Sequence, residues 1–193
     1  MRRFHTLLRL FLTGMFVSSF LSACVNTIPG MQGSGRLAEC SDCFIAHDNG
    51  TVVDTRTQLM WMAKDFRNIE GRSPVDWQEA HTWTTKMNRE RYGGFSDWRI
   101  PTVVEYKTSY TSTKLKRSYD GKAIGYPAAF ADGGGEWYWT EEIAESGGGH
   151  VHRFWIFDFR RGWLDQRYIG HENLGDKVFE TMESIRLVRG GPA

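Results

Sequence analysis

Apolar residues recur every three or four positions from Trp77 to Met87, and this spacing predicts a helix with one buried face. The residues in front of that face carry helix-start signals. Ser73 can act as a cap, Pro74 suits the first helical position, and Asp76 stands three residues after Ser73, an acidic residue at the capping-box spacing. We therefore expect the helix to begin directly behind Ser73.

A second, shorter helix is expected behind Pro101, because Thr102 and Glu105 repeat the capping-box spacing. The stretch 109–135 shows no period and predicts a long irregular segment. Two helices and several antiparallel strands with long loops define an α+β fold. Runs of β-branched, aliphatic and aromatic residues between turn signals predict strands over 51–53, 59–62, 137–140, 151–159, 163–169 and 184–189. A hairpin turn is predicted at 160–162, between two of these strands.

The N-terminus has the pattern of an export signal. Arg2, Arg3 and Arg9 accompany the uncharged, mostly apolar stretch 10–21, which is shorter than the roughly 20 residues that span a bilayer. The stretch runs into Leu-Ser-Ala-Cys, the pattern of a bacterial lipobox, in which Cys24 accepts the lipid. The alternative is an ordinary signal peptide followed by a chance cysteine.

Acyl chains on Cys24 would anchor the protein stably to a membrane. Val25 rather than aspartate follows the cysteine, and by resemblance to enterobacterial lipoproteins this indicates the outer membrane, with the domain facing the periplasm or the cell surface. The expected organisation is a signal peptide over 1–23, then an anchor, flexible tether and CxxC motif over 24–43, a folded domain over 44–189 and a tail over 190–193.

Cys40 and Cys43 form the CxxC motif at the entrance of the domain. In an exported protein the first expectation for such a pair is a local disulfide. A thioredoxin-like redox pair would lie between a strand and a helix, and neither pattern surrounds this motif. A zinc site needs four ligands; His47 offers a third, but no second cysteine pair follows. The redox pair and the metal or free-thiol interpretations remain the alternatives.

Charge argues against a nucleic-acid partner. The chain has 24 Lys and Arg against 23 Asp and Glu, and three of the arginines lie in the export signal, which leaves a slightly acidic remainder. The sequence contains no phosphate loop, nucleotide fingerprint or nucleophile elbow. We expect no cofactor and no catalytic residue.

Five ordered blocks resemble the Lcl C-terminal domain, a family named after a bacterial collagen-like adhesin. The blocks read DNGTVVD at 48–54, YGGFSDWRIPT at 92–102, WYWTE at 137–141, FDF at 157–159 and IRLVR at 185–189. Together they cover nearly all of the expected domain. The resemblance implies a C-type-lectin-like fold, related also to the formylglycine-generating sulfatase-modifying factors, and the adhesin implies binding of sulfated polysaccharides.

The sulfatase-modifying relatives are oxidases that rely on a cysteine pair late in the domain. Here no cysteine follows Cys43. We therefore expect no such oxidase activity and a protein that is not an enzyme.

Metal ligands are the next candidate chemistry. A calcium site could use five carboxylates, but their spacing is not that of a calcium loop, and the favoured alternative is that they cap turns or pair with Arg56, Arg99 or Arg186. His150 and His152 share one face of a strand without an identifiable third ligand. We therefore expect no metal. The five carboxylates are Asp48, Asp54, Asp97, Asp158 and Glu105.

Basic residues in the hairpin and in the long segment are the candidates for binding anions. Trp163, directly after the hairpin turn, is expected to be the most exposed tryptophan and could stack on a sugar ring. The alternative is a solvated rim whose charge is offset by Glu141, Glu142 and Glu145. The basic candidates are Arg153, Arg160, Arg161 and Arg167 with Lys114, Lys116 and Arg117.

Three function classes follow. The leading hypothesis is an outer-membrane-anchored binding or adhesion module that recognises anionic or sulfated glycans. The second is a structural subunit of an envelope protein complex, and the third is a sulfatase-modifying-type enzyme. The expected partners are the membrane, through Cys24, and either a polysaccharide or an envelope protein.

Overall fold

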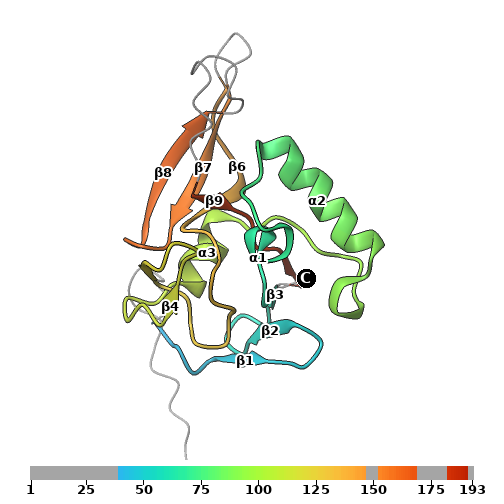
Figure 1. The fold of residues 1–193 in the computed structure, drawn as a ribbon, viewed down its shortest axis with the longest axis vertical. Coiled ribbons are helices and arrows are strands. Elements are labelled where there is room, and N and C mark those ends of the chain that lie inside the picture. Colours follow the sequence, from blue (N-terminus) through green and yellow to red (C-terminus); the bar gives the residue numbers. More distant parts are fainter. Residues whose placement is uncertain (1–38, 147–151, 169–181, 191–193) are drawn as a thin grey trace, which may run out of the picture. The chain divides into compact units, whose positions relative to one another are not determined.

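The computed structural model describes residues 39–146, 152–168 and 182–190, so the expected signal peptide and Cys24 lie outside the described residues. The described part contains three α-helices and three β-sheets, which confirms an α+β fold (Figure 1). None of its helices has the length and apolar character needed to cross a membrane. The helices are α1 (Phe66–Glu70), α2 (Trp77–Arg89), the 3-10 turn η1 (Tyr92–Gly94) and α3 (Val103–Ser109).

The first sheet is antiparallel and has the order β1-β2-β3-β10, formed by β1 (Phe44–Ala46), β2 (Thr51–Asp54), β3 (Met60–Met62) and β10 (Val188–Arg189). The second has the order β8-β7-β6-β9 and is built from β6 (Trp137–Ser146), β7 (His152–Asp158), β8 (Trp163–Tyr168) and β9 (Glu183–Ser184). Within the long segment 109–135, β4 (Lys116–Arg117) pairs with β5 (Ala123–Ile124).

The predicted hairpin is confirmed: β7 and β8 pair antiparallel, with Asp158 opposite Trp163 beside the turn. The single strand predicted over 184–189 is wrong. This segment instead crosses between the sheets, because β9 pairs with β6 in the second sheet and β10 pairs with β3 in the first. Residues 185–187 between them belong to neither strand and are completely buried.

The helix starts follow local side-chain chemistry. At α3, Thr102 and Glu105 form both hydrogen bonds of the predicted capping box. At α2, the cap is Asp76, whose carboxylate accepts the backbone N–H of Glu79 at 2.7 Å, and the prediction of Ser73 is wrong. The Ser73 hydroxyl instead accepts a hydrogen bond from Arg67 at 2.6 Å. The expectation of two helices also missed α1, which is too short to show a helical period.

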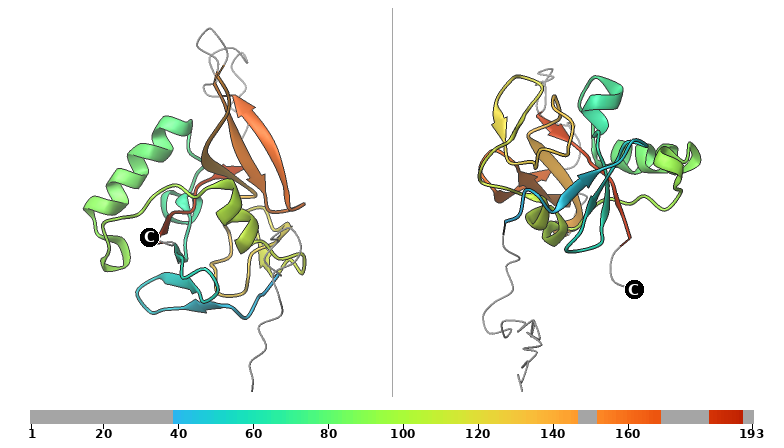
Figure 2. Two further views of the ribbon diagram at one scale, coloured as in Figure 1. Left: turned by 180° about the vertical axis from the view of Figure 1, so that it is seen from behind. Right: turned by 90° about the horizontal axis from the view of Figure 1, so that it is seen from below.

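Two buried clusters form most of the core. The first is aromatic and lies between the sheets and α3; in it the rings of Tyr126 and Phe159 stack with centroids 3.8 Å apart. The second lies beneath α2, where Ala80, Trp83 and Met87 are buried as the helical period predicts. In Figures 1 and 2, α2 and the hairpin β7-β8 lie on opposite sides of the domain.

Asp65 joins α1 to the second sheet. Its Oδ1 accepts the backbone N–H of Asn68 at 2.8 Å and so caps the helix. Its Oδ2 accepts the hydroxyl of Tyr138 at 2.6 Å and the backbone N–H of Gly135 at 2.8 Å. Burial raises the pKa of the Tyr138 hydroxyl well above its usual value, so this group stays protonated and donates to the carboxylate.

The CxxC motif is a disulfide between Cys40 and Cys43, as the sequence predicts. The carbonyl of Cys43 accepts the backbone N–H of Thr55 at 2.9 Å, which fixes the motif beside β2. Glu39, directly before the motif, accepts the backbone N–H and the hydroxyl of Ser112, both at 2.8 Å. The chain therefore enters the domain beside the long segment 109–135.

Candidate functional site

The hairpin turn is built around Asp158. Its carboxylate accepts the backbone N–H of Arg160 at 2.7 Å and that of Arg161 at 3.3 Å. Gly162 closes the turn with a φ of 76°, a conformation that favours glycine. A Cβ at this position would also lie 2.6 Å from the ring of Tyr110, so the turn packs closely against the segment 109–135.

Trp163 follows the turn and is 54% exposed, which confirms that it presents a ring to solvent. The Arg161 guanidinium lies over this ring, with Cζ 5.0 Å from the centroid, and also pairs with Asp158 at 3.3 Å. Because half of the Arg161 side chain remains exposed, Arg161 and Trp163 together still offer a cation and an aromatic face to a ligand.

Glu136 brings the hairpin turn and the long segment together. Its fully buried carboxylate pairs with Arg160 at 3.2 Å through Oε2 and with Lys122 at 3.3 Å through Oε1. Burial raises the pKa of Glu136, and the neighbouring Asp120 raises it further, whereas Lys122 and Arg160 lower it. Arg160 therefore supports a buried group as well as facing solvent, and it is not a free surface charge.

Lys122 also pairs with Asp120, with Nζ 2.6 Å from Oδ2. Lys122 and the hydroxyl of Ser118, which donates to Asp120 at 2.5 Å, hold the pKa of that carboxyl far below its usual range. Glu136, Asp120, Lys122 and Arg160 thus form one connected cluster of two acids and two cations at the hairpin turn. Glu136, Lys122 and Asp120 were not predicted as site residues, because only the folded chain shows that they meet Arg160.

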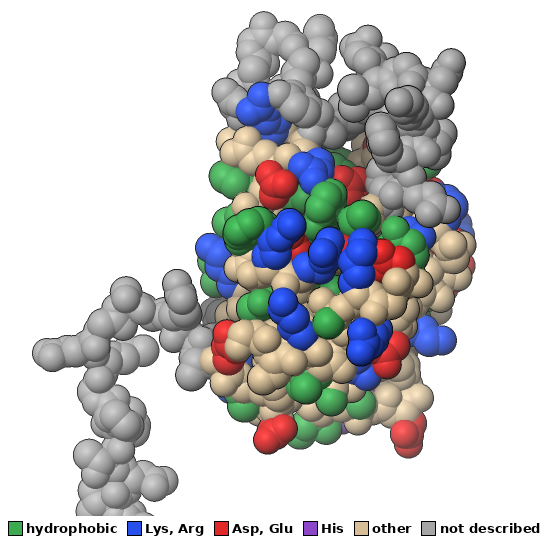
Figure 3. Space-filling view, turned by 60° about the vertical axis from the view of Figure 1, so that its left-hand side comes forward, with side chains coloured by type: hydrophobic (Ala, Val, Ile, Leu, Met, Phe, Trp, Pro, Cys, Tyr) green, Lys and Arg blue, Asp and Glu red, His purple; other side chains and the backbone are tan. Residues whose placement is uncertain are grey.

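Two of the predicted basic residues of the long segment, Lys116 and Arg117, form β4 directly before Ser118 of this cluster. Lys116 pairs with Asp132 at 3.6 Å, and Arg117 donates to the carbonyl of Gly121 at 2.9 Å. Lys114 is exposed and has a left-handed backbone, with a φ of 51°. Figure 3 shows Lys and Arg side chains gathered on the face that carries β8 and the segment 109–135, with hydrophobic side chains between them.

Arg153 and Arg167 lie near the other end of the hairpin. Arg153 lies five positions before Asp158 along β7, or about 16 Å at the usual rise of a strand. Arg167 pairs with Asp165 at 3.1 Å and with Glu183 at 3.4 Å, and it lies 4.3 Å from the centroid of the Trp137 ring. These two arginines therefore do not join the cluster at the turn. Arg153 instead lines a separate surface depression of about 450 Å³ with Trp155, Leu164, Asp165 and Gln166.

Most of the candidate calcium ligands have arginine partners. Asp54 pairs with Arg56 at 3.1 Å and Glu105 with Arg99 at 2.5 Å, as the alternative interpretation predicted. Asp97 pairs with Arg189 at 2.6 Å, and Asp158 holds the hairpin turn. Within the described ranges, no three His, Cys, Asp or Glu side chains are grouped to hold a metal ion. Of the two histidines considered as ligands, His150 lies outside the described residues and His152 begins β7.

Exposed cations beside an exposed tryptophan have the chemistry of a surface for binding. The family model of the Lcl C-terminal domain matches residues 50–189, and the chain belongs to this family. Membership indicates an adhesin-related binding domain, and the family is not a known enzyme family. No curated protein and no solved structure matches the chain significantly.

Proposed function

We propose that the domain binds anionic glycans, sulfated ones in particular, through the basic residues at the hairpin turn and in the neighbouring segment. The observation that carries the proposal is the grouping of cations at the turn: Glu136 holds Arg160 and Lys122 together, and the Arg161 guanidinium lies over the exposed ring of Trp163. We call this set the hairpin-turn surface; it comprises Lys114, Lys116, Arg117, Lys122, Arg160, Arg161 and Trp163.

The chemistry of these groups suits a sulfated sugar. A guanidinium can grip a sulfate or carboxylate through two hydrogen bonds, and an aromatic face adds contact with the apolar side of a sugar ring. Exposed ion pairs contribute only about 0–1 kcal/mol each, so useful affinity requires several of them. The carboxylates that pair with the cations of this surface keep it only weakly basic when no ligand is bound. A bound sulfate group would share these cations with those carboxylates.

Location is part of the same proposal. A lipid on Cys24 would tether the domain to the outer membrane, where it faces the periplasm or the cell surface. The relation to C-type lectins that the family resemblance implies also belongs here, since lectin-like domains commonly present binding loops on a compact scaffold.

An array of sulfated, carboxylated and neutral glycans, probed with the full chain, tests the proposal. We expect binding to the sulfated glycans and none to their desulfated counterparts. Equal binding to sulfated and neutral forms would contradict it. Absence of all glycan binding, with an envelope protein recovered after crosslinking in cells, would favour the structural-subunit alternative.

A further inference from the structure

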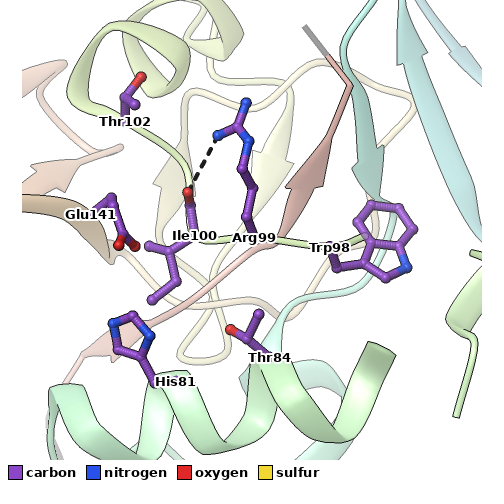
Figure 4. A pocket seen from close by; sticks show the side chains of 7 residues that line it. All are labelled: His81, Thr84, Trp98, Arg99, Ile100, Thr102 and Glu141. Carbon is purple, nitrogen blue, oxygen red and sulfur yellow. Dashed lines mark hydrogen bonds between the residues drawn. The ribbon is translucent and has the colours of Figure 1, made fainter. Parts of the chain in front are cut away.

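A second pocket, of about 450 Å³, lies away from the hairpin turn, between α2, the segment 98–102 and β6 (Figure 4). Its floor includes Trp98 and Ile100, which are both 2% exposed. In Figure 4 the carboxylate of Glu141 and the imidazole of His81 approach the same space from opposite walls, whereas the guanidinium of Arg99 points away from it. His81 and Thr84 come from α2 and Glu141 from β6.

The walls of this pocket are tied to one another. The backbone N–H of Glu141 donates to the carbonyl of Pro101 at 2.9 Å, which joins β6 to the segment 98–102. On the other side, the ring of Trp77 in α2 stacks on Phe154 of β7, with centroids 4.4 Å apart. The groups that line the pocket are therefore held in place before any ligand arrives.

Two oxygen groups of the pocket walls can accept hydrogen bonds. The imidazole of His81 forms part of the wall, but its Nε2 atom is buried and is therefore not an accessible acceptor. The hydroxyl of Thr84 donates its proton to the carbonyl of Ala80 at 2.9 Å, which leaves its oxygen free to accept. The carboxylate of Glu141 makes no hydrogen bond to another described residue, so two oxygen acceptors line the same pocket.

The local charge is negative. Arg99, the cation that lines the pocket, is already held by the carboxylate of Glu105 at 2.5 and 2.8 Å. The carboxylate of Glu142, next to Glu141, accepts the backbone N–H of Val103. Partial burial raises the pKa of Glu141, and Glu142 raises it further, although His81 and Arg99 act to lower it. An incoming cation would therefore stabilise the charged form of Glu141.

We propose that this pocket binds a primary ammonium group. An ammonium carries three N–H donors and no acceptor; the carboxylate of Glu141 and the hydroxyl oxygen of Thr84 can accept two of them, and the third is left for water. The apolar floor formed by Ile100 and Trp98 can take the carbon atoms attached to the nitrogen. The site is independent of the hairpin-turn surface and shares none of its residues.

Two sources offer this chemistry: the side chain of a lysine on a partner protein, and a free amino sugar. The probes are therefore Nα-acetyl-lysine amide and glucosamine, each with its N-acetylated counterpart, in which the ammonium is replaced by a neutral amide. Binding is followed through the backbone amide signals of residues 81–84, 98–102 and 141 in the nitrogen-15-labelled full chain. We expect at least one amine to shift these signals and neither acetylated form to do so; the amine that binds more tightly identifies the source.

Glu141→Gln and Thr84→Val test the assignment of the acceptors. Each keeps the shape of the side chain, and each is expected to weaken binding, by about tenfold for Glu141→Gln because it removes a charged hydrogen-bond partner. Glu90→Gln, an equal charge change at the end of α2, is the matched control and should bind as the parent does. Equal shifts with the acetylated probes, no shift with either amine, or unchanged binding by Glu141→Gln would each overturn the proposal.

Discussion

Asp65 and Arg186 form an ion pair in which Oδ2 and Nη2 are 3.9 Å apart and both side chains are fully buried. The guanidinium lies 4.5 Å from the ring centroid of Tyr126 and 4.8 Å from that of Phe130, and its Nη1 donates to the carbonyl of Met62 at 2.9 Å. The charge of Arg186 is thus compensated by aromatic faces and backbone oxygens as well as by one carboxylate.

Asp65→Asn should lower the free energy of unfolding by about 3–5 kcal/mol, because it leaves the charge of Arg186 buried without its counter-ion. Asp97→Asn is the matched control, since the carboxylate of Asp97 is 59% exposed and pairs with Arg189 at the surface. That exposed pair should contribute no more than about 1 kcal/mol. Urea denaturation of both variants gives the comparison, and equal losses would contradict a central role for the buried pair.

Gly134→Ala should be destabilising by about 1–3 kcal/mol, because the added Cβ overpacks the same network. It would lie 2.5 Å from Oδ2 of Asp65 and 2.9 Å from the hydroxyl oxygen of Tyr138. Gly71→Asn is the control: Gly71 has open space around it and a left-handed backbone that asparagine tolerates. Thermal melts that show no greater loss for Gly134→Ala than for Gly71→Asn would argue against this close approach.

Glu136 should show an unusual pH dependence. Since burial raises its pKa in the folded state, folding favours its protonated form, and the stability it contributes is lost as pH rises through the folded-state pKa. Glu136→Gln stays neutral at every pH. The unfolding free energy of this variant, relative to the parent, should therefore rise as pH increases above the ordinary glutamate pKa of about 4.3.

Glu105→Gln provides the control of opposite sign. Burial acts to raise the pKa of Glu105, but Arg99 and the backbone N–H of Thr102 together lower it. Its stabilising contribution is present above the unfolded-state pKa and is lost as pH falls through the folded-state value. The relative unfolding free energy of Glu105→Gln should thus fall as pH rises, and the same trend in both variants would show that Glu136 is misassigned.

Local signals in the sequence predicted much of the fold. The Thr102 and Glu105 pair fixed the start of α3, and the turn residues at 160–162 predicted the hairpin, because both depend on neighbours in the chain. The predicted cap of α2 is wrong. Ser73 accepts a hydrogen bond from Arg67, a contact that the sequence does not show, and Asp76 caps the helix.

The candidate site was only partly predictable. The exposure of Trp163 follows from its place after a tight turn, which sequence alone indicates. Glu136 is buried between Arg160 and Lys122, so that three segments distant in the sequence meet there, and no local pattern predicts this contact. The separation of Arg153 and Arg167 from the turn likewise becomes clear only from the register of the hairpin, which the structure gives.

Cys24→Ser tests the proposed anchor. Lipid attachment and lipoprotein-type cleavage both depend on the Cys24 thiol, so the variant should lose labelling by a lipid precursor and accumulate as an uncleaved or soluble protein. Metabolic labelling followed by membrane fractionation measures both effects. Unchanged membrane association without precursor accumulation would contradict lipidation at Cys24, and Cys43→Ser should leave labelling intact.

The most direct test of the proposed function is a salt titration of heparin binding by the full chain and by two matched double variants. Arg117→Gln with Arg161→Gln removes two exposed cations of the hairpin-turn surface, whereas Arg89→Gln with Arg91→Gln removes two exposed cations at the end of α2. We expect the affinity of the parent to fall steeply with salt, and the first variant to bind about five- to tenfold more weakly, since each exposed pair contributes up to about 1 kcal/mol. The second variant should bind as the parent does. Salt-independent binding, or equal losses in the two variants, would contradict the account.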